Sequence, residues 1–249
     1  MRLSAVVIAL NEEKNIGGCL DALKFCDEVV VVDGGSADRT AEICKSRGAK
    51  LHTRPFGDFA SQKNFAVSQA KADWVLLVDA DERVTPELAV EIKEMLSAPK
   101  AEGYFFVRQN RIFGRWMAHG ANRDDRHLRL VKREKAVFRG AVHERIYPDG
   151  ATASLRSPLL HYSTSTVSDY LRKLNVYSSL EAGILSEKSS ALSPGKMMAR
   201  SAGVFGYRVF WQRGILDGLE GFIFYALSAY YEMVRFAKLW ELSDGKTRA

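Results

Sequence analysis

Short apolar runs alternate with helix-forming segments over the first hundred residues, and this alternation limits the fold more than any other feature of the chain. The runs are rich in β-branched residues, which is typical of strands buried on both faces. Such an order predicts an α/β fold, a mostly parallel sheet flanked by helices. The predicted strands are Leu3–Leu10, Glu28–Val32, Lys50–Thr53 and Trp74–Val78, and the predicted helices are Asn11–Leu23, Asp38–Ser46, Ser61–Lys71 and Pro86–Leu96.

The first predicted helix carries an expected cap. Asn11 is a suitable N-cap residue, and Glu12 and Glu13 would then lie in the first turn, where acids favour the helix dipole. The N-terminal segment as a whole reads as a strand leading into this helix, not as a signal peptide, because it lacks a small-residue cleavage site.

The pattern changes after Pro99, first to shorter strands and then to helices. The strands are predicted at Gly103–Asn110, Arg126–Lys132 and Ala136–Tyr147, and the helices at Ser168–Leu185, Pro194–Trp211 and Leu216–Leu242. We therefore expect an α/β domain over residues 1–165 and a helical C-terminal region over 166–249.

The last predicted helix contains an apolar run, Gly221–Tyr231. This run is shorter than the ~20 residues that cross a bilayer, so we predict no transmembrane segment. Two interpretations stay open for this helix. It is a core helix, or it lies at a membrane surface with help from nearby cations, which are Arg208, Arg213, Arg235 and Lys238.

Charge and cysteine content restrict the setting of the protein. Three cysteines without a CxxC pair favour a reducing cytosol over a disulfide framework or a zinc site. The net charge of +6 is concentrated between Arg108 and Tyr147, where eleven Lys or Arg face four Asp or Glu. Such a block favours an anionic partner, which could be a phosphorylated acceptor, an acidic lipid surface or a nucleic acid.

The predicted strand Trp74–Val78 ends in the motif Asp79-Ala80-Asp81. Ligands of parallel sheets bind beyond the carboxyl ends of the strands, where these two carboxylates are expected. A calcium-binding EF-hand loop is excluded, because its sixth and twelfth positions are Val84 and Val90. Two carboxylates with phosphate oxygens suit Mg²⁺ or Mn²⁺ instead.

Polar motifs also follow the first two strands, at Asn11-Glu12 and at Asp33-Gly34-Gly35-Ser36. An acid at the tip of strand two can accept hydrogen bonds from a ribose or a base, although Asp-Gly-Gly is equally an ordinary turn signal. A dinucleotide-binding domain needs G-x-G-x-x-G after strand one, and Leu10–Gly18 does not contain it.

Together, Asn11-Glu12, Asp33–Ser36, Gln62-Lys63-Asn64 and Asp79-Ala80-Asp81 resemble the family 2 glycosyltransferases, which have the GT-A fold. The resemblance covers about residues 1–165. It implies a UDP-sugar donor and Mg²⁺ or Mn²⁺ as cofactor. The metal residues that it implies are Asp81 as the direct ligand, Asp79, which lies nearer the ribose, and His161, which can complete the metal shell. The nucleotide-sugar residues that it implies are Ala9, Asn11, Glu12, Asp33, Lys63, Asp79 and Ala80.

Two further segments, Val142–Arg145 and Gly214–Gly218, resemble the bacterial lipopolysaccharide core β-1,4-glucosyltransferases. This narrower resemblance implies an inverting enzyme that moves glucose to an inner-core heptose at the cytoplasmic face of the inner membrane. The partners would be a lipid-linked oligosaccharide and an anionic membrane surface, without nucleic acid. The alternatives are another cell-surface polysaccharide or lipid acceptor, a nucleotidyltransferase, and a non-enzymatic module that binds anionic lipid or nucleic acid.

An inverting transferase needs a general base for the acceptor hydroxyl. Glu144 is the favoured candidate, because it lies in a polar break beyond the metal motif with His143 and Arg145 beside it. Asp125, in the Asp124-Asp125 pair, is the rival, since many relatives use an Asp. The candidates for contact with the acceptor or its phosphate are Arg123, Arg126, Arg129 and the aromatic Trp116.

Overall fold

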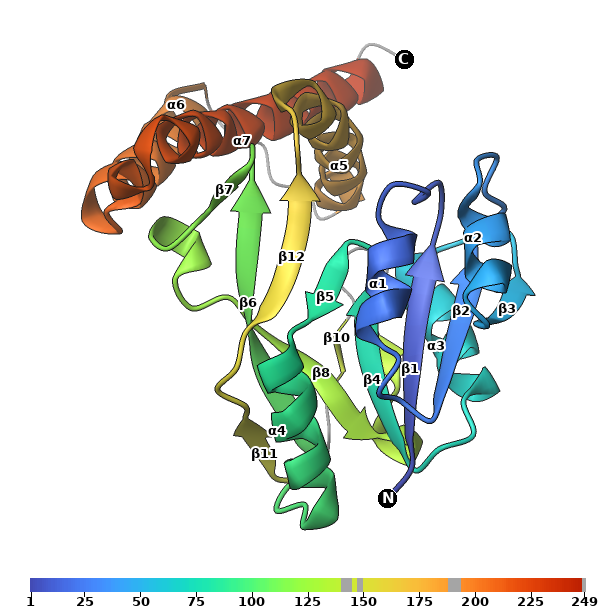
Figure 1. Cartoon of the computed structure of the whole chain (residues 1–249). Helices are drawn as coiled ribbons and strands as arrows, with labels where there is room; N and C mark the ends of the chain where they lie inside the picture. Colours follow the sequence, from blue (N-terminus) through green and yellow to red (C-terminus); the bar gives the residue numbers. More distant parts are fainter. Residues whose placement is uncertain (140–144, 147–149, 188–193, 248–249) are drawn as a thin grey trace. The chain divides into compact units, whose positions relative to one another are not determined.

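The computed structural model describes residues 1–139, 145–146, 150–187 and 194–247. The chain forms two compact units. Unit 1 comprises Met1–Arg108 and Asp125–His161, and unit 2 comprises Gln109–Asp124 and Tyr162–Ala249. Each unit is built around its own secondary structure, shown in Figure 1.

The main sheet is mixed. Its parallel part contains β1 (Leu3–Ala9), β2 (Glu28–Asp33), β3 (Lys50–Thr53) and β4 (Trp74–Asp79). It continues through β8 (Arg126–Lys132), β6 (Gly103–Ile112), β12 (Leu159–Thr164) and β5 (Glu82–Val84). The strand order is β3-β2-β1-β4-β8-β6-β12-β5, and β8 pairs antiparallel with both β4 and β6.

Four shorter strands complete the described sheets. β7 (Arg115–Trp116) and β11 (Thr152–Ser154) pair with β6, and β9 (Phe138–Arg139) pairs with β10 (Arg145–Ile146). Strands β6 and β12 each begin in unit 1 and end in unit 2 along the chain.

Alternating residues of the parallel strands face two separate apolar clusters in unit 1. Leu76 and Val78 of β4 join a cluster with α1 (Ile16–Ala22), α2 (Thr40–Ser46) and α4 (Pro86–Ser97), whereas Val75 and Leu77 join a cluster with α3 (Phe59–Gln69). In Figure 1, α1 lies in front of β1 and α3 behind the sheet. Because both faces are covered, the strands are apolar at nearly every position.

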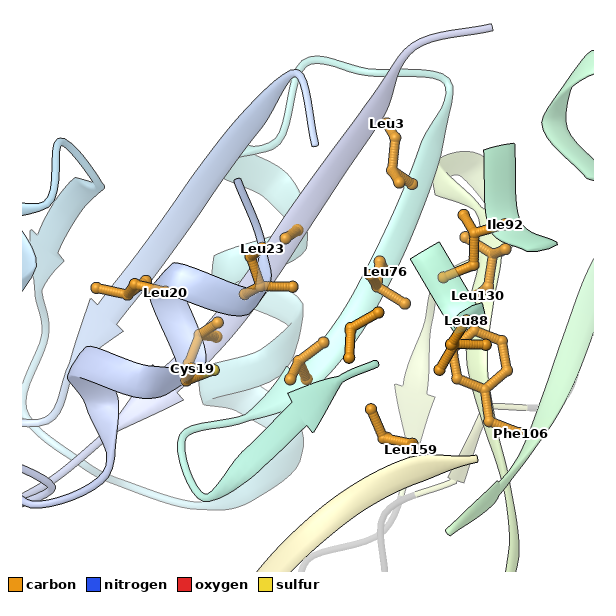
Figure 2. Close-up of a cluster of buried hydrophobic side chains, with 14 of the residues drawn as sticks. Leu3, Cys19, Leu20, Leu23, Leu76, Leu88, Ile92, Phe106, Leu130 and Leu159 are labelled. Atoms are coloured by element: carbon orange, nitrogen blue, oxygen red, sulfur yellow. The ribbon is translucent and has the colours of Figure 1, made fainter. Parts of the chain in front are cut away.

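Figure 2 shows how two helices share the front cluster. Cys19 and Leu20 of α1, with Leu23 just after it, lie to one side of Leu76, and Leu88 and Ile92 of α4 lie to the other, within one apolar cluster. The cluster also receives Leu130, Phe106 and Leu159 from β8, β6 and β12. The parallel strands and the antiparallel strands of unit 1 therefore share one continuous core.

The predicted α/β pattern is confirmed for all four parallel strands and for the helices between them. The first helix is shorter than predicted, since it begins at Ile16 after an Asn15 N-cap. The expectation that Asn11 caps it is wrong, because Asn11 has a left-handed backbone with φ of 55°. Strands β5, β7, β11 and β12 are absent from the prediction, and β5, β11 and β12 pair with segments that are distant in the sequence.

Unit 2 contains three long helices, α5 (Val167–Glu187), α6 (Pro194–Gly206) and α7 (Gly218–Thr247). A π-helical turn at Tyr207–Trp211 and a 3₁₀ turn at Gly214–Asp217 join α6 to α7. Ala182 of α5 packs with Phe236 and Leu239 of α7 in a small buried cluster. No helix in the described part of the chain is long and apolar enough to cross a membrane.

The central position of Leu76 leads to a stability prediction. Its side chain is fully buried in the front cluster, so Leu76→Ala removes apolar contacts and leaves a cavity. We expect the free energy of unfolding to fall by about 2–5 kcal/mol, measured by urea denaturation. The control is Val90→Ala on α4, where the side chain is 56% exposed and the change should stay within about 0.5 kcal/mol. Equal effects of the two substitutions would contradict this prediction.

Candidate functional site at the carboxyl edge of the parallel strands

The strand registers bring the three polar motifs to one edge of the sheet. Ala9 at the end of β1 pairs with Asp33 at the end of β2, and Ile8 pairs with Asp79 at the end of β4. The loops that carry Asn11, Asp33 and Asp81 therefore leave the sheet side by side. This is the edge at which parallel sheets bind ligands.

The loops after β1 and β2 are joined by hydrogen bonds. The backbone N–H of Asn11 donates to Ser36 Oγ at 2.8 Å, and Asn11 Oδ1 accepts from the N–H of Ala37 at 2.9 Å. The N–H of Glu12 donates to Thr40 Oγ1 at 2.8 Å. These bonds explain the left-handed conformation of Asn11, which turns the chain toward the second loop.

Asp33 organises its own loop. Its side chain is 3% exposed, and Oδ2 accepts from the N–H groups of Gly35 and Ser36 at 3.2 and 3.0 Å. Oδ1 accepts from the Ser36 hydroxyl at 2.5 Å. Gly35 has φ of 97°, a conformation that a β-carbon would strain. Asp33 is thus a turn-forming residue. A ligand could bind only to the lone pairs of its carboxylate that these hydrogen bonds do not use.

Asp79 lies between two cations. Its Oδ1 is 3.2 Å from Lys63 Nζ, and its Oδ2 accepts from Arg129 at 2.7 Å. Burial raises the pKa of Asp79, but Arg129 and Lys63 outweigh burial and hold that pKa well below its ordinary value of 3.8. Asp79 is therefore a carboxylate throughout the neutral range.

Arg129 connects Asp79 to a second carboxylate, Glu82, which the sequence motifs did not assign to the site. Glu82 is fully buried, bonds to Arg129, and accepts from the backbone N–H of Asp79 at 2.9 Å. Its Oε1 is also 3.6 Å from Arg108, which in turn donates to Asp125 at 2.8 Å. The motif Asp79-Ala80-Asp81 predicted two carboxylates at this strand end, whereas the pairing of the buried Glu82 depends on Arg129 of the distant strand β8.

Arg129 itself is 6% exposed. The pKa of its guanidinium, which burial alone would lower, is raised by Asp79 and Glu82. Its Nε has no hydrogen-bond partner among the described residues, which is an unfavourable state for a buried N–H group. The arrangement suits Arg129 to holding Asp79 and Glu82 in place from within the protein.

Asp81 and His161 face each other at the same edge. The register of β5 with β12 pairs His161 with Glu82, and this places His161 Nε2 3.3 Å from Asp81 Oδ2. A carboxylate and an imidazole are suitable donors for a divalent cation. No cluster of three or more possible metal ligands occurs in the described ranges. The two groups therefore fit a cation that takes most of its shell from phosphate and water, as Mg²⁺ does.

Other predicted residues have definite places in unit 1. The carbonyl of Ala9 accepts from the N–H of Gly34, and the carbonyl of Ala80 accepts from Arg83 at 3.1 Å. Asp125 bonds to Arg108 through one oxygen and lies 2.7 Å from His127 Nε2 through the other. Arg126 is exposed at the start of β8.

Two predicted residues belong to unit 2, and one lies outside the described residues. Arg123 is exposed, and the Trp116 ring lies 5.4 Å from the Tyr162 ring. Glu144, the favoured base, is outside the part that the structure describes.

The family model for glycosyl transferase family 2 matches residues 4–162, which include both strand-end loops, Lys63, the Asp79–Asp81 motif and His161. The chain belongs to glycosyltransferase family 2. The mixed sheet and its covering helices are the GT-A fold that the sequence motifs predicted.

Relatives of this family 2 glycosyltransferase extend over nearly the whole chain. The lipopolysaccharide core biosynthesis glycosyltransferase LpsC of Rhizobium meliloti (strain 1021) is 31% identical over 256 residues, covering 99% of this chain and 94% of LpsC.

Two solved structures are similar to this chain at lower sequence identity than LpsC. S. aureus TarS in complex with UDP-GlcNAc has a TM-score of 0.49 at 14% identity, covering 98% of this chain and 92% of that one. Glucosyl-3-phosphoglycerate synthase from Mycobacterium tuberculosis with Mn²⁺, UDP and glucosyl-3-phosphoglycerate has a TM-score of 0.48 at 16% identity, covering 68% and 74%.

Removing the Arg129 charge should destabilise the enzyme in a pH-dependent way. Arg129→Met leaves Asp79 and Glu82 without their buried partner, and we expect a loss of about 3–5 kcal/mol in the free energy of unfolding at pH 7. The stability that comes from the low pKa of Asp79 is present above pH 3.8 and disappears as the pH falls through the folded-state pKa. The difference between wild type and variant should therefore narrow below about pH 4.

Denaturant unfolding between pH 7 and pH 3 tests this expectation. The control is Arg126→Met, an exposed position on the same strand, with an expected change within about 0.5 kcal/mol. A stability difference for Arg129→Met that does not vary with pH would show that charge compensation is not its source.

Proposed function

We propose that this family 2 glycosyltransferase transfers a sugar, with glucose the best candidate, from a UDP-sugar to a lipid-linked acceptor in lipopolysaccharide core assembly. The observation that carries the donor assignment is the edge where Asp81 and His161 face each other beside the charge-compensated Asp79. The similarity to LpsC along 99% of the chain supports the acceptor class.

The donor would lie along the carboxyl edge of β1, β2 and β4. The loops of Asn11 and Asp33 would receive the nucleoside, where the glycines beside Asp33 let a ligand approach the backbone. Asp79 would bind near the ribose, held in position by Arg129 and Lys63. This arrangement uses fixed charges that need no reorganisation when the donor binds.

Asp81 and His161 would hold Mg²⁺ or Mn²⁺ together with the donor's phosphates. When bound, the cation would neutralise the charge that develops on the leaving UDP. Lys63 Nζ, 3.2 Å from Asp79 Oδ1, adds a positive charge at the end of β4. The protein itself would hold the two metal ligands, Asp81 and His161, and the ammonium group of Lys63 in fixed positions.

We propose Glu144 as the general base of an inverting reaction. The rival Asp125 has both oxygens engaged, one by Arg108 and one by His127, and this favours a structural role for it. A base must turn an acceptor lone pair toward the attacking hydroxyl, and the two contacts of Asp125 restrict how its carboxylate can turn. Glu144 follows the metal motif in the chain, within a basic segment suited to a phosphorylated acceptor.

We further propose that the enzyme works as a peripheral protein at the cytoplasmic face of the inner membrane. Its acceptor would be an inner-core heptose of a lipid-linked oligosaccharide. Another cell-surface glycolipid acceptor is the alternative within the same reaction class. Turnover with truncated lipopolysaccharides of defined length, assayed across several UDP-sugars, decides between them.

Binding of UDP should require a divalent cation and Asp81. With Mn²⁺ and UDP at about 100 times its dissociation constant, we expect the unfolding midpoint to rise by about 5–10 °C, and UDP without metal should have little effect. Asp81→Asn should abolish the rise in unfolding midpoint that depends on the metal. Asp73→Asn, an exposed residue just before the other end of β4, should leave it unchanged. Stabilisation by polyanions with no effect of UDP would contradict the proposed donor.

Turnover should separate the two candidate bases. Glu144→Gln should lower kcat by about 100-fold or more, because it removes proton transfer, while metal-dependent UDP binding stays intact. Asp125→Asn should mainly lower stability, since it weakens the contact with Arg108. Near-normal turnover of Glu144→Gln, with loss of turnover in Asp125→Asn, would reverse the assignment.

A further inference from the structure

Unit 2 displays a group of exposed apolar side chains on the turns between α6 and α7 and at the start of α7. We call Tyr207–Leu219 the apolar turn. Its most exposed members are Trp211 at 80%, Leu219 at 69% and Phe210 at 63% of full exposure. Soluble surfaces carry scattered apolar residues, but a contiguous group of large ones marks an interaction site. The exposed apolar residues of this turn are Tyr207, Phe210, Trp211, Ile215, Leu216 and Leu219.

A buried tyrosine, Tyr225, packs against the apolar turn and fixes its position. Tyr225 of α7 is fully buried, and its hydroxyl donates to the carbonyl of His119 at 2.7 Å and accepts from Asn122 at 2.8 Å. A β-carbon at Gly214 would lie 2.4 Å from the Tyr225 ring, and one at Gly120 would lie 2.1 Å from its hydroxyl oxygen. Only glycine allows this approach at both positions.

A buried carboxylate provides the second anchor. Asp217 is 2% exposed, and it accepts from the N–H groups of Ala118 and His119, both at 3.0 Å. Its Oδ1 is also 2.9 Å from His119 Nδ1. The N–H of Gly120 donates to the carbonyl of Gln212 at 2.9 Å. The apolar side chains are therefore presented by an ordered framework, not by a frayed connection.

The charge of the apolar turn has one sign at its surface. The segment contains two cations, Arg208 and Arg213, and one acid, Asp217. The acid is buried, whereas Arg213 is exposed and Arg208 half-buried. Arg213 has a left-handed backbone with φ of 59°, so its position is set by the turn and not by local preference. The next acid along the chain, Glu220, has a side chain that is 39% exposed and lies 3.7 Å from Arg115. Within the apolar turn itself, exposed aromatics with cations and no exposed acid match an anionic lipid interface.

The long face of α7 is a weaker candidate for the same role. Arg235, expected at a membrane surface, is 14% exposed and bonds to Glu181 and Glu232. Lys238 donates to oxygens of Asn175 and Ser178 on α5. Both cations therefore serve packing within unit 2.

We propose that the apolar turn Tyr207–Leu219 is the membrane-docking element of this enzyme, and that it inserts into the interface of a bilayer containing anionic phospholipid. The inference deepens the proposed function, since it assumes that the acceptor is lipid-linked. Trp211, Phe210 and Leu216 would enter the headgroup and acyl boundary, where amphipathic aromatic rings are favoured. Arg213 and Arg208 would contact the lipid phosphates.

Vesicle flotation of the full chain tests the proposal, using phosphatidylcholine with and without phosphatidylglycerol. Wild type should bind the anionic vesicles. The combined variant F210S/W211S/L216S should lower the partition coefficient by about tenfold or more. Arg213→Asn, which tolerates the left-handed backbone, should lower it about fivefold on anionic vesicles and hardly at all on neutral ones.

The matched control is Trp240→Ser, an aromatic residue of α7 that is 64% exposed outside the apolar turn. It should bind vesicles like wild type. Equal losses in Trp240→Ser and in the triple variant, or full binding by the triple variant, would overturn the proposal. It would also be overturned if wild type ignored vesicles and the triple variant converted a dimer to a monomer in light scattering, since the turn would then join two copies.

Metal-dependent UDP stabilisation, measured on the same variants, separates the two proposals. It should be the same in wild type and in the triple variant, which also reports correct folding. Intact UDP binding with no vesicle binding by wild type would overturn the docking element and leave the transferase. Vesicle binding by wild type without any stabilisation by UDP would support the docking element and contradict the proposed UDP-sugar donor.

Discussion

The tip of β4 depends on the ion cluster around Arg129. An apolar strand that ends in Asp79, Asp81 and Glu82 concentrates negative charge where the sheet is covered, and burial of uncompensated carboxylates is very unfavourable. Arg129 from β8 compensates Asp79 and Glu82 together, with Lys63 adding to it from α3. The antiparallel addition of β8 to β4 is therefore what allows an acidic motif at this end of the parallel sheet.

The division of roles among the three acids follows from these partners. Asp79 and Glu82 are held by cations, whereas Asp81 faces His161 on β12. Residues that are neighbours in the sequence therefore contact different strands: Asp79 and Glu82 bind Arg129 of β8, and Asp81 faces His161 of β12. The family assignment explains why such an edge exists, and the ion cluster explains how it is stable.

Local pattern was enough to predict the parallel half of the fold and the edge where the motifs meet. Buried strands with β-branched residues, such as Glu28–Asp33, are recognisable without knowledge of their partners. Strand β5 has three residues and β12 pairs with a segment about 75 positions away, so neither could be predicted from its own composition. For the same reason, Glu82 and Arg108 were missed. Their burial and pairing are properties of the assembled sheet.

The hydrogen bonds between the first two loops have a consequence for how this site can diverge. Asn11 and Glu12 depend on Ser36, Ala37 and Thr40 for the bonds that shape them. A substitution in one loop changes the partners available to the other, although some 25 residues separate them. The two loops form one structural unit. In related proteins, the residues of one loop should therefore covary with those of the other.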